Sequence, residues 1–100
     1  MNKDQRKHAA INRVLHKPTS TGMKFLVKKG YIPRPSTILT GMAGLHKARL
    51  VHPNISEEGK FFSLKWLVDH GFEPTINVNN FHGEIKEWME KYLKGQDPTA

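Results

Sequence analysis

The chain contains two nearly identical segments, KFLVKKGYIP at residues 24–33 and KWLVDHGFEP at residues 65–74, offset by 41 residues. Each has apolar residues at helical spacing, followed by Gly, an aromatic residue and Pro. A glycine at a helix end adopts the left-handed conformation, an apolar side chain after it packs back on the helix, and proline prevents another turn. The repeat therefore predicts two helix ends of the same design, each followed by a loop and another helix.

The second segment resembles the end of the second helix of an ankyrin repeat, where a Leu-rich helix stops at a glycine before a short loop. The offset of 41 residues differs from the ankyrin period of about 33 residues. A Thr-Pro-Leu-His signature is also missing, with residues 36–39 its nearest approach. We interpret the resemblance as a shared way of ending a helix, and it assigns no family.

The apolar spacing along the whole chain predicts an all-α (mainly α) fold of about five short helices. An N-terminal basic helix, with Asp4 as its N-cap, precedes two αα-hairpins that pack against each other. The helix from about residue 56 to residue 70 is apolar around most of its surface, so we expect it to be covered on more than one side. At 100 residues the chain predicts a single helical domain at 1–95 and a frayed tail at 96–100.

Local signals predict where the other helices begin, and one segment is ambiguous. Residues 23–32 are short enough to form either a helix end or a strand, because short apolar runs fit both periods. The last helix carries one apolar stripe and closes at Gly95. The candidate N-caps of the intervening helices are Ser20 or Thr21, Ser36 or Thr37, and Asn54 or Ser56.

Positive charge is concentrated in the first half of the chain. Residues 1–52 contain eleven Lys or Arg and one acid, Asp4, for a net charge of +10, whereas residues 53–100 have a net charge of −3. Such asymmetry is typical of proteins that bind a polyanion with one face. The residues predicted to contact nucleic acid are Arg6, Lys7, Arg13, Lys17, Lys24, Lys28, Lys29, Arg34, Lys47 and Arg49.

The stretch TGMAGLHKARL, residues 40–50, has three interpretations. Gly44 could be the turn of a helix-turn-helix variant, with residues 45–51 presented to DNA. Residues 41–44 could form a GXXG backbone clamp like that of KH domains. Alternatively, the small residues could let two helices approach closely.

Residue types of catalytic and metal sites are sparse. The chain has no Cys, and its six His, at positions 8, 16, 46, 52, 70 and 82, include no HxH or HxxxH pair. Zinc sites draw on such residues, so we expect no metal, no cofactor and histidines on the surface. Gly-rich phosphate loops and GxSxG nucleophile motifs are absent too. We therefore expect a protein that is not an enzyme.

The charge pattern favours a small, basic, regulatory nucleic-acid-binding protein of bacterial or phage type, with DNA preferred over RNA. The alternative is a protein-protein interaction module, or a small inhibitor, that docks its basic face on an acidic surface of a larger nucleic-acid-processing complex. No membrane partner is expected, because no apolar run approaches the roughly 20 residues that span a bilayer. The basic N-terminal segment lacks the apolar stretch of a secretory signal, which predicts a cytoplasmic location. Self-association as a homodimer is left open.

Overall fold

A computed structural model describes residues 2–99, which form five α-helices and one short 3-10 helix. No β-strand occurs in this part of the chain, so the all-α prediction is confirmed and the strand alternative for residues 23–32 is wrong. The elements are α1 (Lys3–His16), α2 (Ser20–Lys28), α3 (Ile38–Val51), α4 (Glu57–Asp69), η1 (Val78–Asn80) and α5 (Gly83–Leu93).

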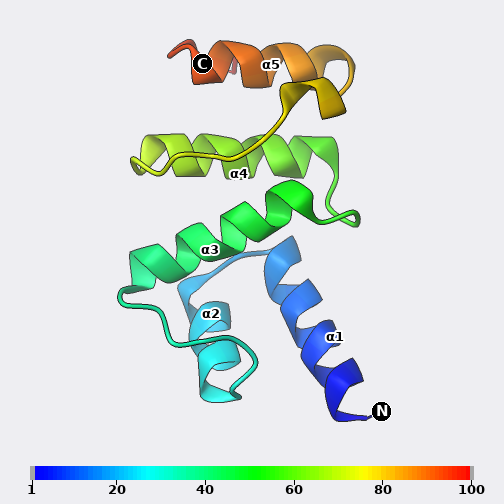
Figure 1. Cartoon of the computed structure of the whole chain (residues 1–100), viewed down its shortest axis with the longest axis vertical. Coiled ribbons are helices and arrows are strands. Elements are labelled where there is room, and N and C mark those ends of the chain that lie inside the picture. Colours follow the sequence, from blue (N-terminus) through cyan, green and yellow to red (C-terminus); the bar gives the residue numbers. More distant parts are fainter. Residues whose placement is uncertain (1, 100) are drawn as a thin grey trace.

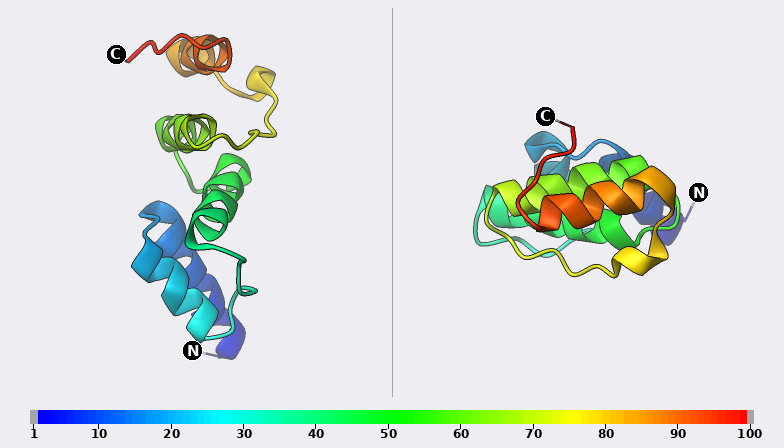
Figure 2. Two further views of the ribbon diagram at one scale, coloured as in Figure 1. Left: turned by 90° about the vertical axis from the view of Figure 1, so that its left-hand side faces the viewer. Right: turned by 90° about the horizontal axis from the view of Figure 1, so that it is seen from above.

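The molecule measures 42 × 28 × 20 Å, and its helices are stacked along the longest axis (Figure 1). α3 contacts α1 and α2 on one side and α4 on the other, and α5 packs on the far side of α4. Figure 2 shows α1 and α2 side by side at one end of this stack. The prediction that the α4 helix is covered on more than one side is therefore confirmed.

Both copies of the repeat end a helix in the predicted way. At the end of α2 the N–H of Gly30 donates to the carbonyl of Val27 at 3.0 Å, and the N–H of Tyr31 donates to the carbonyl of Leu26 at 2.9 Å. The same pair of bonds ends α4, at 3.1 and 2.8 Å. Gly30 and Gly71 have φ angles of +74° and +79°, which favour glycine. This bonding pattern is the Schellman motif, so the repeat is explained by helix termination.

Two predicted helix starts are shifted along the chain. α1 is capped by Asn2, whose side chain accepts from the N–H of Gln5 at 2.8 Å, while the Gln5 side chain accepts from the N–H of Asn2 at 3.0 Å. This reciprocal capping box satisfies two free donors, so Asp4 lies in the first turn instead of at the cap. α2 is capped by Thr19, one residue before the predicted candidates. The caps Thr37 and Ser56 are among those predicted.

α3 runs without a break through Gly41 and Gly44. A helix-turn-helix with its turn at Gly44 is therefore wrong, because residues 45–51 continue the same helix. The GXXG clamp is wrong for the same reason, since it requires a loop. A Cβ at Gly41 would lie 1.9 Å from Met23 Sδ, so α2 and α3 approach closely only because this position is glycine. A Cβ at Gly44 would meet nothing within 4 Å, so the packing interpretation is confirmed at Gly41 alone.

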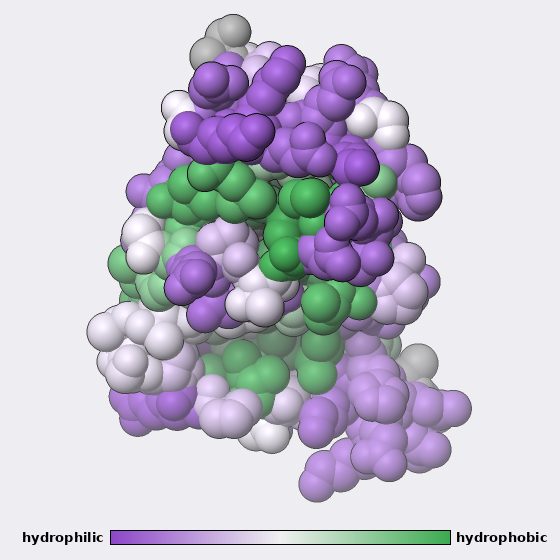
Figure 3. Space-filling view, turned by 45° about the horizontal axis from the view of Figure 1, so that its top comes forward, coloured by the Kyte–Doolittle hydropathy of each residue, from purple (hydrophilic) through white to green (hydrophobic). Residues whose placement is uncertain are grey.

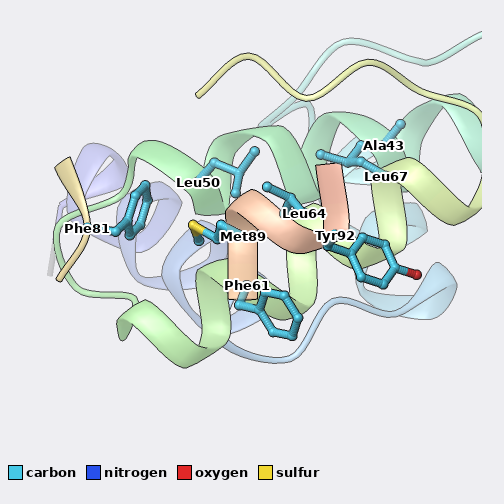
Figure 4. Packing of buried hydrophobic residues seen from close by; sticks show 8 residues of the cluster. All are labelled: Ala43, Leu50, Phe61, Leu64, Leu67, Phe81, Met89 and Tyr92. Carbon is cyan, nitrogen blue, oxygen red and sulfur yellow. The ribbon is translucent and has the colours of Figure 1, made fainter. Parts of the chain in front are cut away.

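α3 forms a shared wall between two hydrophobic cores. Because it contributes to both, it fixes the basic half of the chain against the acidic half. The N-terminal core contains Val14, Leu15, Met23, Leu26, Leu45 and Ile55. The C-terminal core, whose side chains come mainly from α3, α4 and α5 (Figure 4), contains Ala43, Leu50, Phe61, Leu64, Leu67, Phe81, Met89 and Tyr92.

Candidate nucleic-acid interface

Nine of the ten predicted contact residues are exposed, and the tenth, Arg49, is buried. Most of the exposed cations belong to α1, α2 and residues 29–37, which we call the basic end. Because α1 and α2 lie side by side at one end of the stack (Figure 2), these charges are gathered there. The nine exposed residues are Arg6, Lys7, Arg13, Lys17, Lys24, Lys28, Lys29, Arg34 and Lys47.

A groove on one side of α2 brings together three of the predicted residues. This α2–α3 groove has a volume of ≈ 520 Å³, and Lys24, Lys28 and Arg34 contribute its cations. Its remaining lining is formed by the α2 side chains Met23 and Val27 and by residues 35–38. The groove therefore combines an apolar floor with three positive charges.

The N-terminus of α3 opens into the same groove. Thr37, which lines the groove, is the N-cap of α3, and Ile38 is its first helical residue. The first turn of this helix contains no acidic residue. The free N–H groups at a helix N-terminus carry partial positive charge and favour anions. The helix end thus adds to the positive potential of the three cationic side chains.

A second groove lies on the other side of α2, against α1. This α1–α2 groove, of ≈ 330 Å³, brings together the cations Arg6, Arg13 and Lys29. It also contains Phe25, which is 45% exposed, and the half-buried Tyr31. Phe25 was not among the predicted contact residues, because that prediction selected positive charges alone. α2 is thus flanked by two basic grooves, and the α1–α2 groove also contains two aromatic side chains.

Few opposing charges accompany these cations. Asp4 is the single acid among residues 1–52. The two ion pairs in the described part of the chain lie in the other half, between Lys65 and Asp97 at 3.2 Å and between His82 and Glu57 at 2.9 Å. The cations of the basic end therefore remain available to an external anion.

Arg49 is a correction to the predicted contact set, because it binds the protein's own backbone. Its guanidinium donates to the carbonyl oxygens of Leu15 at 2.9 Å, His16 at 3.4 Å and Gly59 at 3.1 Å. The first two are carbonyls of the last turn of α1, which lack helical partners. Burial lowers the pKa of Arg49. Arg49 therefore ties α1 to α3 and α4 and is not available to a nucleic acid.

Three other predicted residues are exposed but line neither groove. Lys7 belongs to α1, and Lys17 is the C-cap residue that follows this helix. Lys47 projects from α3 toward the C-terminal half, where its Nζ lies 5.9 Å from the centre of the Phe72 ring. The structure therefore brings together six of the ten predicted residues, three in each groove.

His46 contradicts the expectation of surface histidines. It is 8% exposed, its Nδ1 lies 3.0 Å from the Oγ of the fully buried Ser63, and its ring stacks on Trp66 at 4.5 Å. Burial, followed by the positive charges of Arg49 and His70, lowers the pKa of His46 from 6.5 to about 4. Because Ser63 is fully buried, the pair joins α3 to α4 inside the protein.

The depressed pKa of His46 predicts a loss of stability in mild acid. The unfolded chain binds a proton on this residue between about pH 6.5 and pH 4, whereas the folded protein does not. The free energy of unfolding should therefore fall by about 2 kcal/mol from about pH 7 to about pH 5. Urea unfolding at both pH values measures this fall. In His46→Gln the fall should be much smaller, and an equal fall in that variant would assign the effect to other groups.

The remaining large groove does not favour one charge. It lies between the ends of α3 and α4 and residues 75–81, with a volume of ≈ 600 Å³. Its ionisable lining is one acid, Glu57, and one base, Lys60. Figure 3, seen from the α5 side, shows hydrophilic side chains at the top and hydrophobic side chains exposed across the middle of this face. The two grooves of the basic end, with three cations each, therefore favour an anion more strongly than this groove does.

Neither a metal site, nor a membrane-spanning helix, nor a similar protein adds to the interpretation of the described residues. Within residues 2–99, no three His, Asp or Glu side chains come together as metal ligands would. None of the helices in that range combines the length and hydropathy needed to cross a membrane. No family model, no curated protein and no solved structure matches the chain.

Proposed function

We propose that the protein is a non-enzymatic nucleic-acid-binding protein that contacts phosphates with the two basic grooves on either side of α2. The observation that carries the proposal is the gathering of six unpaired cations around one short helix. Phosphate oxygens are bound mainly by Arg and Lys side chains and by helix N-termini. The α2–α3 groove offers both kinds of donor.

The mode of binding differs from that of a helix-turn-helix protein. α3 is buried along much of its length between two cores, so it is not free to enter a major groove. The exposed helices of the basic end are α1, with 14 residues, and α2, with nine. Contacts with the phosphate backbone need only cations within reach of it, and they supply affinity without sequence readout. We therefore expect little sequence preference.

Charge-matched variants test this proposal. Replacing Lys24, Lys28 and Arg34 with Ala should weaken binding of a labelled DNA on the order of 10- to 100-fold, because three phosphate contacts are lost. The control replaces Lys86 and Lys91 of α5 and Lys94, the C-cap residue after it, with Ala, which removes the same charge from the opposite end of the stack. Fluorescence anisotropy measures both affinities. Equal losses in the two variants would mean that net charge alone drives binding.

A second candidate function, docking on an acidic protein surface, is supported by the apolar floor of the α2–α3 groove. Ile38 at the edge of that groove is 48% exposed, and its neighbour Leu39 is 46% exposed. Apolar residues ringed by cations fit an acidic peptide with apolar anchors. The two candidates differ in their response to salt, since apolar anchors hold a peptide at salt concentrations that release a phosphate backbone.

A further inference from the structure

The α1–α2 groove has a property that phosphate binding alone does not use. Phe25 leaves 45% of its surface exposed although it belongs to a helix whose other large apolar residues, Met23 and Leu26, are fully packed. It is not part of the N-terminal core. Tyr31, held at the helix end by its bond to Leu26, lines the same groove. The exposed Phe25 ring and the half-buried Tyr31 ring, which packs against the N-terminal core, thus line one basic groove.

The cations of this groove lie around those rings. Lys29 Nζ is 5.9 Å from the centre of the Phe25 ring, and Arg6 and Arg13 line the groove from α1. The α1 wall between the two arginines includes Ala9 and Ala10, whose small side chains leave the groove open. Proteins that bind single-stranded nucleic acids combine such a basic groove with aromatic side chains on which bases stack.

We propose that the α1–α2 groove receives an unstacked base of a single-stranded nucleic acid, with its face on Phe25 and Tyr31. The flanking phosphates are then held by Arg6, Arg13 and Lys29. This inference rests on the proposed function and adds a preference for single strands, because the bases of a duplex are stacked on one another and offer no free face. DNA and RNA strands share this chemistry.

The test compares labelled strands of equal length that differ in their bases. An oligo(dT), an oligo(U), an abasic strand with the same phosphates and a duplex DNA are titrated by fluorescence anisotropy. The wild-type protein should bind the strands with bases about 5- to 100-fold more tightly than the abasic strand, the range expected for stacking of one base. Either strand exceeding the abasic one supports the proposal.

Matched phenylalanine variants locate the effect. Phe25→Leu keeps an apolar side chain but removes the aromatic face, so it should lower the affinity for oligo(dT) toward that of the abasic strand and leave the abasic and duplex affinities unchanged. The control is Phe62→Leu, because Phe62 is 64% exposed on α4, outside the basic end. It should change none of these affinities. Circular dichroism melting confirms that both variants are folded.

The outcomes separate this inference from the proposed function. Salt-sensitive binding of all strands, with equal affinity for the abasic strand, oligo(dT) and oligo(U), overturns base stacking and leaves phosphate binding standing. An equal loss on every ligand in Phe25→Leu also overturns stacking, since only the ligands with free bases should respond. No binding of any strand at low salt overturns both proposals.

Discussion

Replacing Arg49 with methionine is expected to lower the free energy of unfolding by about 2–4 kcal/mol, because its charged hydrogen bonds are lost and buried carbonyls at the end of α1 are left without donors. Methionine keeps much of the packing of the arginine stem while removing the guanidinium. The guanidinium is closely packed against α4, since a Cβ at Gly59 would lie 2.9 Å from Arg49 Nη2. Urea unfolding followed by circular dichroism measures the change.

Lys47→Met is the matched control for this prediction. Lys47 lies on the same helix, but it is exposed and makes no hydrogen bond to another element among the described residues. Its replacement should change the free energy of unfolding by less than about 0.5 kcal/mol. If Arg49→Met were as stable as Lys47→Met, the guanidinium would not be the link between α1 and the rest of the fold.

The second large effect is on salt dependence. If the six groove cations all contact phosphates, the affinity for duplex DNA should fall on the order of a thousandfold between about 50 and about 200 mM salt, because each contact releases condensed counterions. A single strand should show a shallower fall, since its counterion density is lower. Anisotropy titrations at four salt concentrations give the slope. An affinity that changes little over this range would contradict contacts between these cations and phosphates.

The helix ends could be predicted from the sequence because their chemistry is local. The end of α2 is determined by three residues within four positions of one another, Gly30, Tyr31 and Pro33. The exposure of most cations also followed from the sequence, since charged side chains are rarely buried without partners. The positive charges of the first half of the chain lie at one end of the molecule, because α1 and α2 lie side by side there.

Arg49 shows what could not be predicted. Its main partner, the carbonyl of Leu15, lies 34 residues away in the sequence, and only the crossing of α1 and α3 brings the two together. Locally, Arg49 has the same basic surroundings as Lys47, which stays exposed. The glycines of α3 were ambiguous for a similar reason. A glycine at a turn and one at a close helix contact look alike in sequence, and only the position of Met23 against Gly41 distinguishes them.

The slope of log Kd against log salt concentration tests most directly whether the basic end contacts a phosphate backbone. It is measured with one labelled duplex for the wild-type protein, for the triple variant of Lys24, Lys28 and Arg34, and for the triple variant of Lys86, Lys91 and Lys94. Our account predicts that the first variant lowers the slope by about 2–3, roughly one for each lost phosphate contact, and that the second leaves it unchanged. Identical slopes for all three proteins would contradict it.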